Sequence, residues 1–186
     1  MFWRRVITML SLLSLAGCST YPPLRTASHV DLKRFMGDWY VIANIPTAVE
    51  KGAHNAVESY ALRKDGTINT TFTFRKGGFD GEKKTMYPKG FVKDKQSNAV
   101  WGMQFLWPFK ADYRILYVSP DYSRTIIGRV KRDYVWIMAR TPTIAPADYK
   151  KLLAIIKAQG YDIDRIQPVP QHWPTEDVRP DLKKAS

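Results

Sequence analysis

Residues 54–76, HNAVESYALRKDGTINTTFTFRK, contain two runs that are typical of β-strands, His54 to Arg63 and Thr67 to Lys76. Between them stands Asp65-Gly66, a dipeptide that favours a tight turn between antiparallel strands. The stretch therefore predicts a β-hairpin, and the rest of the chain can be interpreted outward from it.

Six more strand-like runs surround this hairpin, with short connections and no helix between them. They are Asp38 to Ile45, Lys83 to Lys93, Asn98 to Trp107, Asp112 to Ser119, Thr125 to Val130 and Tyr134 to Thr141. Strands in direct succession predict an antiparallel meander. Eight such strands can close on themselves, which removes exposed edges and leaves room for one small ligand. The predicted fold class is all-β, an eight-stranded antiparallel up-and-down barrel.

One amphipathic helix follows the strands. Pro146 suits its first turn and Gly160 suits its C-terminal stop. The apolar residues at helical spacing on one face are Tyr149, Leu152, Leu153 and Ile156. We expect this face to pack on the outside of the barrel, so that residues 31–168 form one domain. Residues 169–186 are rich in proline, and we expect an extended or loose tail there.

Residues 1–17 have the features of a signal peptide. Arg4 and Arg5 precede the apolar run Val6 to Leu15, which is shorter than the roughly 20 residues of a transmembrane helix. The run ends in Leu15-Ala16-Gly17-Cys18, which resembles the lipobox of bacterial lipoproteins. The resemblance implies cleavage before Cys18 and lipidation of its sulfur and its new amine. The alternative is an ordinary secretory signal followed by a coincidental cysteine.

Residues 18–30 are expected to form a lipidated tether. Three acyl chains exceed the two signals that stable membrane anchoring needs. Ser19 stands where an aspartate would be the usual signal for retention in the inner membrane, so the resemblance favours the outer membrane, with the protein facing the periplasm. Cys18 is the only cysteine, which excludes an intrachain disulfide and a cysteine-based zinc site.

The chain is strongly basic, with a formal net charge of +12. Basic residues are scattered and do not recur on one face of a helix, so we expect no nucleic acid partner. A basic surface can instead attract anionic lipid head groups.

Three motifs, in order along the chain, resemble those of a known family. Phe35 to Tyr40 contains Gly37 and Trp39, Pro120-Asp121-Tyr122 is a turn, and Trp136 to Arg140 ends in arginine. This set resembles the lipocalins, and in particular the bacterial outer-membrane lipocalins related to apolipoprotein D. The resemblance implies that the motif residues are structural: Gly37, Trp39, Asp121, Tyr122 and Arg140. Trp39 would plug the closed end of the barrel, with Arg140 lying over its indole.

Alternation along the strands identifies candidate ligand-binding residues. They are Glu58, Tyr60, Trp101, Met103, Phe105, Phe109, Tyr113, Tyr117, Trp136 and Met138. Such an aromatic and methionine-containing lining suits an acyl chain, and the family resemblance implies a fatty acid or a lysophospholipid as ligand. The alternative is that some of these residues fill a solid core. Phe109 is expected in a loop near the open mouth.

Glu58 is the one charged residue among these candidates. If it points inward, it needs a partner such as Arg75 or Arg114, or its pKa rises. We hypothesise that it recognises a positively charged head group; the alternative is that it lies in solvent.

Two further functions are open. A few relatives by resemblance are enzymes, but the sequence has no Gly-x-Ser-x-Gly nucleophile motif, and His29, His54 and His172 form no catalytic or metal-binding spacing. We therefore expect no enzyme, no cofactor and no metal. The other alternative is a structural envelope lipoprotein with a filled barrel. A homodimer is possible, and no motif decides it.

Overall fold

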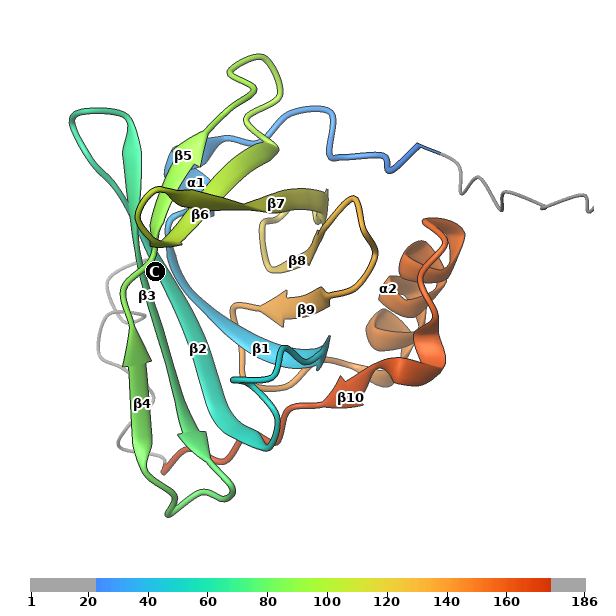
Figure 1. The fold of residues 1–186 in the computed structure, drawn as a ribbon. Helices are drawn as coiled ribbons and strands as arrows, with labels where there is room; N and C mark the ends of the chain where they lie inside the picture. Colours follow the sequence, from blue (N-terminus) through green and yellow to red (C-terminus); the bar gives the residue numbers. More distant parts are fainter. Residues whose placement is uncertain (1–22, 175–186) are drawn as a thin grey trace, which may run out of the picture.

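The computed structural model describes residues 23–174 (Figure 1). Its elements are α1 (Leu32–Phe35), β1 (Gly37–Ile45), β2 (Ala53–Leu62), β3 (Thr67–Lys76), β4 (Lys83–Met86), β5 (Lys89–Val92), β6 (Val100–Leu106), β7 (Phe109–Val118), β8 (Arg124–Gly128), β9 (Val135–Ala139), α2 (Pro146–Ala158), a 3-10 turn (Ile163–Arg165) and β10 (Gln167–Pro168).

The strands form a closed antiparallel barrel. Each pairs with its successor around the sheet, and β9 returns to β1, with Tyr40 opposite Ala139 and Ile45 opposite Val135. β4 and β5 occupy one position in the ring, because both pair with β3. Pro88 separates them, since proline has no N–H to donate to a sheet. The predicted eight-stranded barrel is confirmed, with its fourth strand, Lys83 to Lys93, interrupted in the middle.

The two ends of the barrel differ. At one end α1 closes the opening, and the Asp31 carboxylate accepts hydrogen bonds from the backbone N–H groups of Lys33 and Arg34 at its start. Phe35 is fully buried and contacts the ring of Trp39. The opposite end is open and is bordered by the loops of residues 46–52, 77–82, 107–108 and 129–134.

Helix α2 packs against the outside of the barrel, as predicted (Figure 1). Its Leu152 and Ile156 are buried together with outward-facing residues of β8 and β9 such as Ile126 and Ile137. Beyond the helix, the Tyr161 hydroxyl accepts a hydrogen bond from the Arg129 N–H and donates one to the Arg129 carbonyl, at 2.8 and 2.9 Å. No helix within residues 23–174 is long and apolar enough to cross a membrane.

Both ends of the described chain lie against the barrel. The Ala27 N–H donates to the Ile115 carbonyl and the Val30 N–H to the Ser97 carbonyl, so residues 23–30 are bound for most of their length. After β10, residues 169–173 are extended, and the Val169 N–H donates to the Ile42 carbonyl. This part of the predicted tail is therefore fixed to β1 rather than loose. The predicted signal peptide, Cys18 and the last twelve residues of the tail lie outside the described residues.

Candidate functional site

The three predicted motifs meet at the closed end. The Arg140 guanidinium lies 3.7 Å from the centre of the Trp39 ring, and it donates to four backbone carbonyls of residues 34–38 at 2.7–3.1 Å. Burial lowers the pKa of Arg140 to about 10, so the group stays charged at neutral pH. Gly37 has φ of +92°, a conformation that side chains other than glycine rarely adopt. Arg140 thus ties α1 and the start of β1 to the end of β9.

The turn motif supports the same end. The Asp121 carboxylate accepts hydrogen bonds from the hydroxyls of Ser119 and Ser123, which hold its pKa well below the usual range. The Tyr122 hydroxyl accepts from the Asp31 N–H at 2.8 Å, and the Arg34 guanidinium lies 4.1 Å from the centre of the Tyr122 ring. These residues connect the β7–β8 turn to α1, and together with Arg140 they line a polar surface pocket at the closed end.

Aromatic side chains fill the closed half of the barrel. Trp101 stacks on Tyr113 with 5.2 Å between ring centres, while Tyr60 meets the Trp101 ring edge-on and Phe35 packs against both. Trp39 and Trp101 are fully buried. This cluster is a solid floor, because the rings pack in the offset and edge-to-face contacts that aromatic groups favour.

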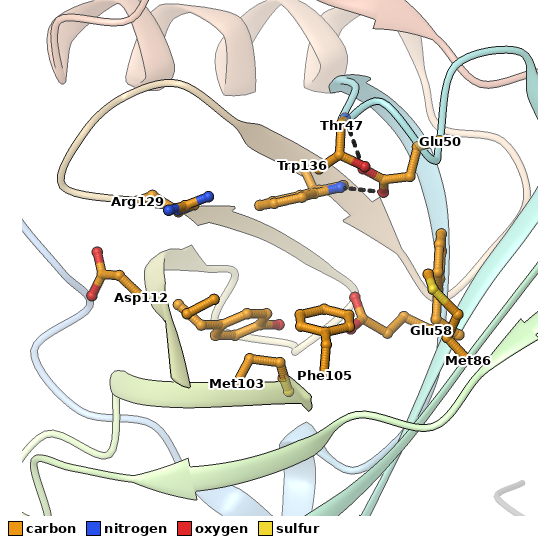
Figure 2. A pocket seen from close by; sticks show the side chains of 12 residues that line it. Thr47, Glu50, Glu58, Met86, Met103, Phe105, Asp112, Arg129 and Trp136 are labelled. Atoms are coloured by element: carbon orange, nitrogen blue, oxygen red, sulfur yellow. Dashed lines mark hydrogen bonds between the residues drawn. The ribbon is translucent and has the colours of Figure 1, made fainter. Parts of the chain in front are cut away.

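Above this floor lies a cavity of about 110 Å³ that opens toward the mouth of the barrel (Figure 2). Its lining comes from strands around the ring and from two mouth loops: Thr47, Glu50, Glu58, Phe72, Met86, Met103, Phe105, Ala111, Asp112, Tyr113, Arg129 and Trp136. Most of this surface is apolar. Two methionines and Phe105 contribute side chains that can change rotamer, so the lining can adapt its shape.

Glu58 is the charged group deepest in this cavity. It lies on β2 opposite Trp39 and Phe72, with its carboxyl group toward the cavity. Burial raises the pKa of Glu58 to about 7, against the effect of a hydrogen bond from Tyr60, and the negative charge of Glu50 raises the pKa further.

The hydrogen bond to Glu58 continues into the aromatic floor. The hydroxyls of Tyr60 and Tyr113 are 2.5 Å apart. A hydroxyl has one proton to donate, so when Tyr60 donates to the Glu58 carboxylate it accepts from Tyr113. Burial raises the pKa of both tyrosines well above the ordinary value, so both hydroxyls remain protonated.

The predicted partners of Glu58 bond elsewhere. Arg75 donates to the Gly81 carbonyl at 3.1 Å, and Arg114 pairs with Asp112 at 3.0 Å. Neither arginine is therefore the partner of Glu58, and of the two outcomes expected for an inward-facing Glu58 the structure shows the raised pKa. The alternative in which Glu58 lies in solvent is wrong, since the carboxyl group lines the cavity.

The mouth of the cavity carries two ordered polar groups. Glu50, from the loop after β1, is buried; it accepts hydrogen bonds from the Trp136 indole N–H at 2.7 Å and from the Thr47 N–H at 3.0 Å. These bonds fix the Trp136 ring across one wall, as the dashed lines in Figure 2 show. On another wall Arg129 lies 3.5 Å from Asp133.

The predicted ligand-binding residues divide into two groups. Five line the cavity: Glu58, Met103, Phe105, Tyr113 and Trp136. Five do not. Tyr60, Trp101 and Met138 are buried in the interior core. Phe109 begins β7 and is not in a loop, because the turn before it consists of only Trp107 and Pro108; its side chain is 73% exposed.

Tyr117 is displaced by a bulge. Alternation from Tyr113 and Ile115 places it inside, but the β7–β8 register shifts between Ile115 and Tyr117. The extra residue moves Tyr117 to the outer face, where it packs with the cluster under helix α2. A bulge leaves no clear mark in an apolar sequence, so period-two reasoning fails beyond it.

Several residues that line the cavity were not predicted from the sequence. Alternation along β3 and β4 carries enough signal to find Phe72 and Met86. Glu50, Thr47 and Arg129 belong to loops or strand ends, where periodicity gives no direction. Their position depends on how the loops fold over the mouth.

The histidines do not approach the cavity. His29 Nδ1 lies 3.2 Å from the Gln96 carbonyl, and His54 and His172 both pack on the Phe79 ring. Among residues 23–174 no group of three or more His, Cys, Asp or Glu side chains is arranged to hold a metal ion.

Comparison with known proteins assigns the family. The model of the lipocalin-like domain matches residues 30–171, so the chain belongs to the lipocalin family. Temperature-induced lipocalin-1 of Arabidopsis thaliana is 34% identical over 148 residues, which cover 76% of this chain and 80% of that protein. Outer membrane lipoprotein Blc of Citrobacter freundii is 28% identical, covering 83% of this chain and 88% of the relative.

Apolipoprotein D of Mus musculus is also similar, with 28% identity and 78% of each chain covered. Among solved structures, insecticyanin from the tobacco hornworm superposes with a TM-score of 0.65 at 13% identity, covering 83% of this chain and 87% of the other. That likeness concerns the fold alone. The chain is thus a lipocalin similar to the bacterial outer membrane lipoproteins and to apolipoprotein D, and the family suggests a small hydrophobic ligand.

Proposed function

We propose that this lipocalin is anchored by lipid to the outer membrane, facing the periplasm, and that it holds a fatty acid or lysophospholipid in its barrel in order to maintain the envelope. The observation that carries the proposal is the apolar cavity inside the closed barrel, which lies toward the end opposite α1. Burying an acyl chain there removes it from water, which favours binding by about 0.8 kcal/mol for each methylene group.

The size of the cavity limits how the ligand enters. Its 110 Å³ is less than the roughly 300–1,000 Å³ typical of pockets for drug-sized ligands. The slender end of an acyl chain fits first, and a longer segment requires Met86, Met103 or Phe105 to turn aside. These are the side chains of the lining that change shape at least cost.

The anchor and the compartment rest on the leader and on the relatives. The leader ends in a lipobox-like segment at Cys18, and three relatives from different bacteria carry the name outer membrane lipoprotein. Labelled palmitate should be incorporated into the native chain and lost in Cys18→Ser. Equal labelling of both would refute the anchor.

Ligand binding can be read from a tryptophan that the cavity contacts. Trp136 lines the cavity, whereas Trp173 lies outside the barrel with its ring against Tyr40. Titration with palmitate or lysophosphatidylcholine should change the fluorescence of the native protein and of Trp173→Phe, and the change should largely disappear in Trp136→Phe.

The variants Trp136→Phe and Trp173→Phe distinguish binding inside the barrel from binding to its outer surface. A change that survives in Trp136→Phe but disappears in Trp173→Phe would place the ligand outside the barrel. No response to any fatty acid, lysolipid or hydrophobic dye would refute the proposal and favour a structural lipoprotein with a filled barrel.

A further inference from the structure

The hairpin between β6 and β7 exposes an unusual amount of apolar surface. Leu106, Trp107 and Phe109 are 72%, 80% and 73% exposed, and Phe105 is 59% exposed. Four of the five residues 105–109 thus have large apolar side chains that face solvent, and the fifth is Pro108. Exposed clusters of this kind mark a binding surface, because single exposed apolar residues are common but contiguous ones are not.

The hairpin stands at the mouth of the cavity. Phe105 both lines the cavity and belongs to the exposed cluster, so the apolar surface continues from the hairpin into the barrel. Two neighbouring loops of the same end add exposed Val49 and Val130, and the Val130 N–H donates to Asp112 near the start of β7. At the closed end, Leu62 is the one large apolar side chain exposed among the described residues.

The N-terminal segment ends near the same mouth. The Arg25 N–H donates to the Gln159 side chain at 3.0 Å, and the Arg132 side chain, from the β8–β9 loop, donates to the Gln159 carbonyl at 2.6 Å. Figure 1 shows this segment leaving the barrel beside helix α2, across the molecule from the β6–β7 hairpin. Cys18 precedes Pro23 by five residues, which reach about 17 Å when extended.

Two exposed lysines lie in the loops beside the apolar surface, Lys131 in the β8–β9 loop and Lys51 in the loop after β1. Lys110 follows the hairpin, but its ammonium group lies 3.8 Å from the centre of the Phe91 ring on β5. Asp80 and Glu82 in the β3–β4 turn oppose them in part. Tryptophan and phenylalanine bordered by lysine is the composition of segments that lie in the interface of an anionic membrane.

We propose that the β6–β7 hairpin, residues 105–109, inserts into the lipid bilayer to which the chain is anchored, so that the mouth of the barrel faces the membrane. This inference rests on the proposed anchor at Cys18. The anchor and the hairpin then hold two sides of one rim against the bilayer. A lipid leaves the membrane along Phe105 and enters the cavity without crossing water.

The test uses the full lipidated protein in vesicles of phosphatidylethanolamine and phosphatidylglycerol at a 3:1 ratio, with and without brominated phosphatidylcholine. Bromine in the acyl chains quenches tryptophan fluorescence only at contact distance. The native protein should be quenched, and Trp107→Phe should lose most of that quenching. Leu106→Ser should lower the ratio of inserted to free hairpin by about tenfold, since burying one leucine contributes more than 1.4 kcal/mol.

Leu62→Ser is the matched control, with the same substitution at the closed end, and it should leave quenching unchanged. Quenching that persists in Trp107→Phe, or that falls equally in Leu62→Ser and Leu106→Ser, would overturn the inference.

Measuring ligand binding in detergent separates the proposal of hairpin insertion from the proposed ligand function. Binding without quenching refutes hairpin insertion alone, and quenching without binding refutes the proposed ligand function alone. Vesicle flotation of each variant verifies the anchor, and circular dichroism verifies the fold.

Discussion

Replacing Glu58 with glutamine should stabilise the protein at alkaline pH and leave it nearly unchanged at acidic pH. Glutamine keeps the shape and can still accept a hydrogen bond from Tyr60, but it carries no charge that burial must penalise. The pKa of Glu58 rises from 4.5 in the unfolded chain to about 7 in the folded protein. At 1.36 kcal/mol for each pKa unit, the charged carboxylate destabilises the folded protein by up to about 3 kcal/mol.

The sign follows from which state binds the proton more tightly. Here the folded state does, so the contribution of Glu58 to stability is complete below pH 4.5 and is lost as the pH rises through about 7. The free energy of unfolding of the native protein and of Glu58→Gln should therefore differ little at pH 4 and by about 2–3 kcal/mol at pH 8, with the variant more stable.

Urea denaturation at the two pH values, followed by circular dichroism, measures this difference. Glu82→Gln is the control, because it makes the same substitution at a side chain that is 72% exposed rather than buried. Equal stability of native protein and Glu58→Gln at pH 8 would contradict the reasoning, since it would mean that the carboxyl group is solvated or paired within the barrel.

Two further predictions concern the scaffold. Arg140→Ala should lower the free energy of unfolding by roughly 3 kcal/mol, because several backbone carbonyls of residues 34–38 lose a charged donor and Trp39 loses its cation; Arg140→Lys should recover only part, since lysine cannot reach all of them. Gly128→Ala should lower the free energy of unfolding by about 1–3 kcal/mol, because the new Cβ would lie 2.3 Å from the Tyr161 hydroxyl and 2.6 Å from Leu116. An unchanged melting temperature would show that the segment containing Tyr161 shifts without cost.

Local sequence patterns were sufficient to predict most of the fold. Period-two alternation and turn residues such as Asp65-Gly66 depend only on near neighbours in the chain, so the strand succession could be predicted from them. Helix α2 was predictable for the same reason, as Pro146 and Gly160 stand at or near its ends. The motif residues around Trp39 and Arg140 also lie where the resemblance places them.

The boundary between floor and cavity was not predictable in this way. By alternation, Tyr60 lies on the same strand face as Glu58, and Trp101 on the same face as Met103. Nevertheless Tyr60 and Trp101 belong to the packed aromatic floor, whereas Glu58 and Met103 line the cavity. All four side chains point into the barrel, and alternation predicts only the side of the sheet on which a residue lies, not its depth in the interior. How far the interior is filled depends on side chains from five or more strands, which meet only when the barrel closes.

The amino-acid sequence by itself determined the succession of strands and the amphipathic helix that follows them, because each of these is encoded in residues close together in the chain. The tertiary structure alone decided which interior residues remain open to a ligand, because a bulge reversed Tyr117, the loop after β1 brought Glu50 to Trp136, and neither event follows from local periodicity. It also decided that the apolar hairpin and the start of the described chain lie near the same open end, since that proximity arises only from the closure of the sheet.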